Sequence, residues 1–346
     1  MEKEKTIALK VPKAKAESMR RLLIEKNLLR TDLIILKNEK YLYLPIKEDT
    51  ENDFDFPFVD KVFKKRKEKI ESYKELIDLP DDLLELLPTS FDIIGSIALL
   101  KLSDELLAYK NTIGKALISA QSQVETVCLI QPVAGELRTR SVEVVAGKKT
   151  TLTVHKEYGL CFFVDVEKTY YSPRLAGERH RVSKLVKNGE MIVDMFTGVA
   201  PFPVMIASFA QPKKIIATDK NKDAIRLAEK NVNNNKVSDN VELFCDDAEN
   251  IEVLMKKKNV LADRVIMNLP FRSFEFFSKA LNIINDTAVI HYYEIRAEDT
   301  IDERITQLNN VAEKKNMLIV DTVVHKIKTY APREFYIGID ITAQKK

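Results

Sequence analysis

The stretch LIVDTVVHKIKTYAPREFYIGIDITA, residues 318–343, decides the topology of the C-terminal half of the chain. Its two apolar runs are rich in β-branched and aromatic residues, which favours strands. Only a short turn around Ala331 and Pro332 separates them. Two strands joined so closely can pair only as an antiparallel hairpin, because a parallel pair needs a crossover connection of roughly a dozen residues or more. The sequence therefore predicts a sheet that ends in an antiparallel pair.

Upstream of this hairpin, apolar runs alternate with helix-like segments such as residues 222–235. The five runs are MIVDMF, KIIATD, VELFCD, RVIMNLP and TAVIHYY. Such alternation predicts a parallel sheet covered by helices on both faces. Five parallel strands followed by an antiparallel hairpin resemble the class I methyltransferases. We therefore predict an α/β fold of this class over residues 167–346, a Rossmann-like sheet with an antiparallel last strand.

The first 166 residues show a different pattern. Residues 1–60 combine one amphipathic helical segment with two short strands, which predicts a small N-terminal α/β module. Residues 61–166 predict an α+β middle domain that begins with a basic helix over residues 61–74. This basic stretch is either a solvated helix face or a surface that contacts phosphates. Together with residues 167–346, these segments give three predicted domains.

Composition narrows the class of protein further. The net charge of only +3 gives no overall basic excess, so any contact with nucleic acid must be local. The three cysteines fit neither a zinc spacing nor a disulfide framework, and the four histidines show no ligand spacing, so we expect no metal. No apolar run approaches the roughly 20 residues that span a bilayer. We expect a cytoplasmic protein without a membrane segment.

Acidic residues follow three successive strands of the predicted sheet, where doubly wound sheets bind their ligands. Asp194 ends the first run and Gly198 follows it, Asp219 ends the second, and Asp246 and Asp247 follow the third. An acid after the second strand can accept the hydroxyls of a ribose, and one after the third can accept an adenine amino group. Each acid alone could equally be a helix cap. In series they resemble an S-adenosylmethionine pocket.

The fourth run ends in Asn268, Leu269 and Pro270. Methyltransferases that act on planar nitrogens have Asn-Pro-Pro-Tyr or a related motif at this place. The amide and a neighbouring backbone carbonyl can hold the edge of a planar target, while proline fixes the turn. The alternative is a plain strand end that proline terminates.

Taken together, these motifs resemble one family, the archaeal and eukaryotic tRNA (guanine-N1)-methyltransferases that act at position 37, next to the anticodon. The matching stretches are KYLYLPI, GELRTR, TLTVHKEYG, YYSPRLAGERHR, VDMFTGVAPF, VIMNLP, HYY and YAPREF. The resemblance implies S-adenosylmethionine as cofactor and tRNA as partner. It implies a monomer that contacts the anticodon loop and, through its N-terminal module, the tRNA elbow. The stretch FTGVAPFP departs from the FAGVGPFS of better-known members at Thr197, Ala200 and Pro203.

The resemblance also implies roles for individual residues. Guanine N1 carries a proton at neutral pH, so its methylation needs a base and a cationic partner for the charge that grows on O6. Glu178 would be the base, Arg138 would steady O6, Asn268 would orient the guanine edge, and Tyr170 would position base and cofactor. Such a site must form between the middle domain and the sheet. The expected cofactor-binding residues are Arg179, Asp194, Phe196, Gly198, Asp219, Lys220, Asp246, Asp247 and Asn268.

Three alternatives stay open. Some archaeal relatives with a proline at the position of Pro203 also methylate C7 of a wyosine precursor at the same tRNA position. A methyltransferase for a small molecule or a protein is a second alternative, which the two extra domains and the basic stretch disfavour. The third is a catalytically inactive RNA-binding protein, which the presence of Glu178, Arg138 and Asn268 disfavours.

Overall fold

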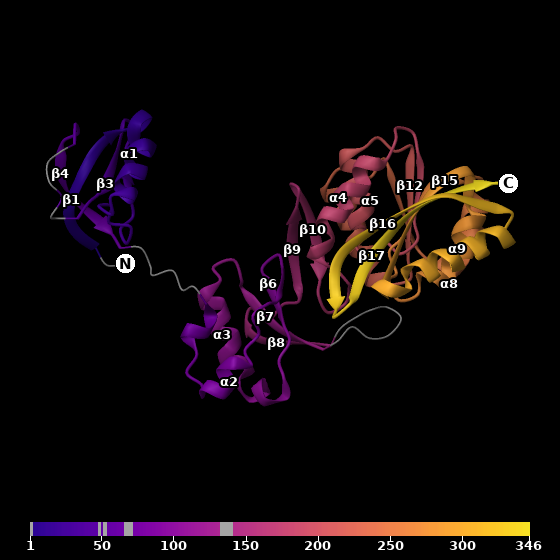
Figure 1. The fold of residues 1–346 in the computed structure, drawn as a ribbon, viewed down its shortest axis with the longest axis horizontal. Helices are drawn as coiled ribbons and strands as arrows, with labels where there is room; N and C mark the ends of the chain where they lie inside the picture. Colours follow the sequence, from indigo (N-terminus) through magenta and orange to yellow (C-terminus); the bar gives the residue numbers. More distant parts are fainter. Residues whose placement is uncertain (1–2, 48–49, 51–53, 66–71, 132–140) are drawn as a thin grey trace. The chain divides into compact units, whose positions relative to one another are not determined.

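The computed structural model describes residues 3–47, 50, 54–65, 72–131 and 141–346 (Figure 1). Within the last of these ranges, seven strands form one sheet in the order β13-β12-β11-β14-β15-β17-β16. Neighbours among β11 to β15 pair in parallel, whereas β17 runs antiparallel to both β15 and β16. The predicted class I methyltransferase fold is confirmed. The strands are β11 (Met191–Asp194), β12 (Lys214–Asp219), β13 (Val241–Cys245), β14 (Ala262–Met267), β15 (Ile284–Ala297), β16 (Met317–Ala331) and β17 (Glu334–Lys345).

Helices cover both faces of this sheet because its central strands are apolar on both sides. In β11, Ile192 packs into one core and Val193 into the other, and in β14, Ile266 and Val265 divide in the same way. The first core contains α4 (Ala176–Leu185), α5 (Pro201–Phe209) and α6 (Lys222–Asn234). The second contains α7 (Ile251–Lys258), α8 (Ser273–Asn282) and α9 (Ile301–Lys314). The short 3-10 turns are η3 (Pro173–Leu175), η4 (Ala248–Asn250) and η5 (Glu298–Thr300).

A smaller four-stranded sheet precedes this domain, in the order β5-β6-β7-β8. Its parallel pair, β6 and β7, is connected through α3, and the other neighbours are antiparallel. Helix α3 lies close against the sheet at Gly114, where a Cβ atom would stand only 2.9 Å from that of Ala146. The elements are η1 (Tyr73–Leu76), α2 (Asp81–Glu85), β5 (Asp92–Ile94), β6 (Ile97–Leu100), η2 (Asp104–Tyr109), α3 (Lys110–Ala120), β7 (Thr126–Ile130) and β8 (Val142–Gly147).

A hairpin that turns at Tyr158 and Gly159 packs on the methyltransferase domain. Its two turn residues have φ values of 48° and 84°, as a tight hairpin turn requires. The side chain of Asn231 in α6 accepts from the backbone nitrogen of Phe163 at 2.6 Å and donates to its carbonyl at 3.2 Å. This amide therefore pairs with the hairpin edge as a neighbouring strand would. The strands are β9 (Leu152–Glu157) and β10 (Leu160–Asp165).

The chain divides into two compact units, Met1–Glu75 and Leu76–Lys346. The first unit packs α1 on an antiparallel sheet of order β2-β3-β1-β4, so the predicted helix and the two predicted short strands, β2 and β3, are present. Leu9, Leu23 and Leu44 lie in its core. Its elements are β1 (Lys3–Pro12), α1 (Lys13–Glu25), β2 (Leu36–Lys37), β3 (Tyr41–Pro45) and β4 (Phe58–Lys64).

The basic helix predicted over residues 61–74 is wrong at its start. Residues 61–64 belong to β4, which pairs with β1 and crosses the predicted domain boundary after residue 60. Residues 66–71 lie outside the described part of the chain. The sequence did not reveal this pairing because β4 is an edge strand whose Asp60, Lys61 and Lys64 side chains are exposed and charged, a common protection of sheet edges.

Candidate active site

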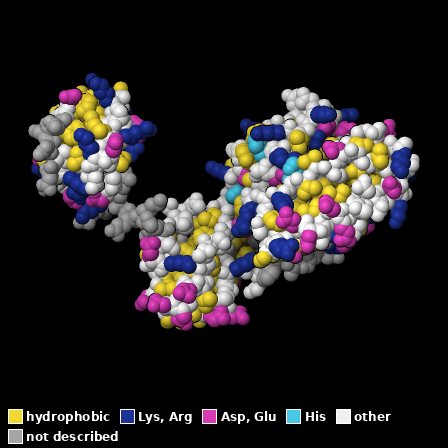
Figure 2. All heavy atoms as spheres, in the orientation of Figure 1, with side chains coloured by type: hydrophobic (Ala, Val, Ile, Leu, Met, Phe, Trp, Pro, Cys, Tyr) yellow, Lys and Arg dark blue, Asp and Glu magenta, His cyan; other side chains and the backbone are white. Residues whose placement is uncertain are grey.

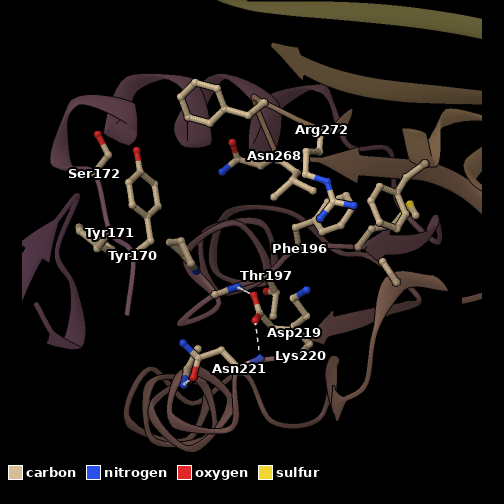
Figure 3. A pocket seen from close by; sticks show the side chains of 18 of the residues that line it. Tyr170, Tyr171, Ser172, Phe196, Thr197, Asp219, Lys220, Asn221, Asn268 and Arg272 are labelled. Atoms are coloured by element: carbon tan, nitrogen blue, oxygen red, sulfur yellow. Dashed lines mark hydrogen bonds between the residues drawn. The ribbon is translucent and has the colours of Figure 1, made fainter. Parts of the chain in front are cut away.

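A pocket lies beyond the carboxyl ends of β11, β12, β13 and β14, where an open α/β sheet binds its ligands (Figure 3). Among the described residues, those that line it come from residues 170–276, and none comes from the range 61–166 that was predicted to form a middle domain. Of the predicted site residues, the lining includes Tyr170, Arg179, Phe196, Gly198, Asp219, Lys220, Asp247 and Asn268. Three predicted residues do not line it, Glu178, Asp194 and Asp246. Arg138 lies outside the described residues.

Asp219 organises the loop that follows β11. Its Oδ2 accepts a hydrogen bond from the backbone nitrogen of Gly198 at 2.7 Å, and its Oδ1 accepts one from that of Asn221 at 2.9 Å. Burial raises the pKa of this carboxyl. Gly198 has a φ of 55°, which favours glycine, and the nearest atom to a Cβ built there is the carbonyl oxygen of Tyr170 at 3.7 Å. The loop therefore brings bare backbone to the pocket wall.

Asp194 lies beneath this loop rather than at the pocket surface. It ends β11 fully buried, and its Oδ1 accepts from the backbone nitrogen of Phe196 at 3.2 Å. Burial raises its pKa to about 7. Its place explains why the sequence pattern misleads here: the acid at a strand end can shape the turn without facing the ligand.

The two acids after β13 have different positions. Asp246 Oδ1 accepts from the backbone nitrogen of Asp247 and from Asn250 Nδ2, both at 2.8 Å, as a turn former does. Asp247 lines the pocket while its Oδ1 accepts from the backbone nitrogen of Glu249 at 3.0 Å. Its Oδ2 lies 3.9 Å from Lys220 Nζ. Of the two, Asp247 is therefore the one placed to meet a ligand.

The turn after β14 presents a side chain rather than its carbonyl groups. The carbonyl oxygen of Leu269 accepts from the backbone nitrogen of Ser273 at 2.9 Å, and that of Pro270 accepts from Ile295 at 3.0 Å. These carbonyls, which the sequence offered as ligands for a planar target, are engaged in the start of α8 and in β15. Asn268 itself lines the pocket, and Figure 3 shows its amide across the same space from the Tyr170 ring.

Glu178 lies on the first turn of α4 and takes part in a buried polar network. Its Oε1 accepts from the Tyr293 hydroxyl at 2.7 Å, and Arg181 donates to its two oxygens at 2.7 and 2.8 Å. Arg181 Nη1 also donates to Asp340 at 2.7 Å, and Asp340 accepts from the His291 ring at 2.6 Å. Burial lowers the pKa of His291, which favours its neutral form.

Sequence reasoning missed most of this network because its members come from α4, β15 and β17. Arg181 alone had a local signal, since it stands three residues after Glu178 on the same helix face. Arg179 points elsewhere and pairs with Glu157 of β9, which was not expected either. Its Nη2 also donates to the carbonyl of Ser172 at 3.1 Å. Both arginines thus have structural partners.

Within the described residues, no group of three or more His, Cys, Asp or Glu side chains is arranged to hold a metal ion. In the same part of the chain, no helix has the length and apolar character needed to cross a bilayer. The three cysteines are free, and they range from buried Cys128 to exposed Cys245.

The fold and the pocket together define a class I, S-adenosylmethionine-dependent methyltransferase. The family model described as "TRM5/TYW2 methyltransferase domain" matches residues 153–320, and that of the "tRNA methyltransferase 5 N-terminal domain" matches residues 8–55. The model of the "TYW2 N-terminal domain" matches residues 70–150. The chain belongs to the TRM5/TYW2 family of methyltransferases, which confirms the resemblance that its motifs predicted.

Individual relatives extend the match over nearly the full chain. The tRNA (guanine(37)-N(1))-methyltransferase Trm5b of Pyrococcus abyssi is 37% identical over 97% of this chain and 98% of its own. A structure titled as the complex of aTrm5 and tRNALeu has a TM-score of 0.73 at 36% identity, over 97% of this chain and 99% of that one. A tRNA(Phe) (4-demethylwyosine(37)-C(7)) aminocarboxypropyltransferase of Methanocaldococcus jannaschii is 36% identical over 60% of this chain and 81% of its own.

Proposed function

We propose that this protein transfers the methyl group of S-adenosylmethionine to N1 of guanosine at position 37 of tRNA. The observation that carries the proposal is the similarity along 97% of the chain to a protein of that named activity. The aminocarboxypropyltransferase matches only 60% of the chain. The N-terminal match to the tRNA methyltransferase 5 domain supports the same choice.

The pocket residues fit S-adenosylmethionine, which supplies an electrophilic methyl group on a sulfonium. Gly198 lets backbone approach a ligand closely, and Phe196 and Phe276 give the pocket apolar walls. Each oxygen of Asp219 accepts one backbone hydrogen bond and keeps a lone pair for a ribose hydroxyl. Asp247 would accept the adenine amino group. We assign no direct cofactor contact to Asp194 or Asp246, whose carboxylates shape the loops instead.

The substrate base would enter between Tyr170 and Asn268, which face each other across the pocket in Figure 3. The base in an anticodon loop must leave its stack to reach such a site. We keep Glu178 as the candidate base for the N1 proton and Arg138 as the candidate partner of O6. Glu178 would have to turn from Arg181 toward the pocket, whose lining includes its chain neighbour Arg179.

Contacts with the rest of the tRNA would come from basic surfaces and would position it without reading its sequence. Exposed basic side chains on α1 include Lys13, Lys15 and Arg21, and Figure 2 shows such side chains on the surface of the first unit. We propose that this unit binds the tRNA elbow, that a separate middle domain follows β4 and extends to residue 166, and that the protein acts as a monomer in the cytoplasm. Light scattering of the full chain with and without tRNA tests the monomer.

The test of the activity is methyl transfer from S-adenosylmethionine to unmodified tRNA transcripts that carry guanosine or adenosine at position 37. Nucleoside mass analysis should find 1-methylguanosine with the guanosine transcript and no methylated product at position 37 with adenosine. No product with either transcript, although the cofactor binds, would reject the proposal. A transcript carrying the tricyclic wyosine precursor then tests the alternative C7 methylation, since its product has a different mass and retention time.

A further inference from the structure

A tyrosine two strands away from Asn268 donates a hydrogen bond to the oxygen of its amide. Tyr336 lies in β17, which is separated from β14 by β15, and its hydroxyl donates a hydrogen bond to Asn268 Oδ1. The Tyr336 side chain is buried, with 1% of its surface exposed. Its ring stands 6.2 Å from that of Tyr293, and the Lys328 ammonium lies 5.3 Å from its centroid. Packing on both sides therefore fixes the position of the hydroxyl.

Holding the oxygen of an amide also fixes its nitrogen. A carboxamide accepts hydrogen bonds at one end and donates two at the other. With Oδ1 of Asn268 turned to the Tyr336 hydroxyl, Nδ2 is turned toward the Tyr170 side of the pocket, as Figure 3 shows. A phenol hydroxyl is a better donor than acceptor, so it favours this orientation over the flipped one. At Asn268, the pocket therefore presents N–H donors to a substrate base.

The orientation matters because guanine and adenine differ at the atom next to N1. Guanine carries the acceptor O6 there, whereas adenine carries the N6 amino group, a donor. An amide nitrogen that faces the base can donate to O6 and leaves the amino group of adenine without an acceptor. When N1 of guanine loses its proton and gains a methyl group, negative charge grows on O6, and a fixed donor at that atom stabilises the transition state.

We propose that Tyr336 is a positioning residue that orients the Asn268 amide, so that its nitrogen selects guanine over adenine and stabilises the charge on O6. The inference rests on the proposed function, because it concerns the same base. Tyr336 does not touch the substrate in this account. It acts only through Asn268, so an experiment can test whether its effect disappears when the Asn268 amide is removed.

The experiment compares Tyr336→Phe, Asn268→Ala and the double variant in single-turnover methyl transfer to the guanosine-37 transcript. Phenylalanine keeps the ring and removes the hydroxyl. We expect Tyr336→Phe to lower the rate at saturating tRNA about 10- to 100-fold, somewhat less than the loss of a direct oxyanion donor. In the Asn268→Ala background the same change should alter the rate by less than about 3-fold, because the amide through which it acts is gone. Tyr292→Phe removes a comparably buried hydroxyl, bonded to Glu294 at 3.1 Å in the other core, and should change little.

A binding measurement tests the selectivity. The ratio of dissociation constants for adenosine-37 and guanosine-37 transcripts should fall about 3- to 10-fold in Tyr336→Phe, the value of one neutral hydrogen bond. Equal rate losses by Tyr336→Phe with and without Asn268, or an unchanged ratio, would overturn the inference and leave Tyr336 a packing residue. Failure of the wild-type protein to methylate the guanosine transcript would instead reject the proposed function, so the two failures are distinguishable.

Discussion

Glu157 and Arg179 form a buried ion pair below the pocket that ties the β9–β10 hairpin to α4. Arg179 Nε donates to Glu157 Oε2 at 3.0 Å, and Nη2 donates to Oε1. The Tyr171 hydroxyl donates to the same Oε1 at 2.5 Å, and its ring lies 5.1 Å from the guanidinium carbon. Because Tyr170 adjoins Tyr171 in the chain, this pair also sets the pocket wall at Tyr170.

Breaking this pair should destabilise the fold. Glu157→Gln leaves the Arg179 guanidinium buried beside a neutral amide, and the loss of one partner of a buried pair costs about 3–5 kcal/mol. The loss is measured as the difference in the free energy of unfolding between the variant and wild type in urea titrations. Glu125→Gln is the matched control, because its ion pair with Lys148 is solvent-exposed and should contribute less than about 1 kcal/mol. Equal losses in both variants would contradict the structural role given to Arg179.

Asp219 and Asp246 should differ in their effect on the cofactor. In Asp219→Asn, the amide nitrogen must face one of two backbone N–H groups, from Gly198 or Asn221, so the loop and the ribose acceptor are both disturbed. We expect affinity for S-adenosylhomocysteine to fall at least about 10-fold by calorimetry. Asp246→Asn keeps the accepting Oδ1 of its turn and should change affinity less than about 3-fold. A larger loss of affinity in Asp246→Asn than in Asp219→Asn would show that Asp246 contacts the cofactor.

Asp194 should make the stability of the free protein depend on pH. Its pKa is raised to about 7 by burial, above the roughly 3.9 of an unfolded aspartate. The folded state therefore binds more protons between these values, and this group's contribution to stability is lost as the pH rises to 7. Asp194→Asn carries no such charge. Relative to wild type, the stability of this variant should be about 2–3 kcal/mol greater at pH 8 than at pH 5, since each pH unit between the two pKa values contributes about 1.4 kcal/mol. A pH-independent difference would mean that Asp194 stays ionised when buried.

Glu178→Gln separates a catalytic role from a structural one. If the carboxylate takes the N1 proton, its loss should slow methyl transfer at saturating substrates by about 10²–10⁴-fold. The tRNA affinity should change little. The control Glu313→Gln, an exposed residue of α9, should keep the wild-type rate. A variant that is less stable yet transfers methyl groups at the normal rate would show that Glu178 serves only the network with Arg181 and Tyr293.

Much of the fold could be predicted from local sequence. The run KIIATD at residues 214–219 coincides with β12, and the hairpin at residues 318–343 agrees with β16 and β17 within two residues at each end. The apolar periodicity of a strand or helix extends over a few consecutive residues, so a short stretch of sequence is enough to predict the element. The strand β4 was missed because the exposed charges of Asp60, Lys61 and Lys64 resemble a solvated segment.

The location of the candidate site could be predicted from the sequence, but the contacts among its side chains could not. The sequence by itself determined that Asp219 and Asn268 lie at the carboxyl ends of parallel strands of one sheet, because the βα alternation fixes which ends of the strands meet. Only the tertiary structure decided that Asp247 rather than Asp246 faces the pocket, that Glu178 accepts a hydrogen bond from Tyr293, and that Tyr336 holds the Asn268 amide. These choices depend on side-chain directions and on the order of strands in the sheet. Asn268 and Tyr336 are 68 positions apart, and Glu178 and Tyr293 are 115 positions apart, so no local pattern records these contacts.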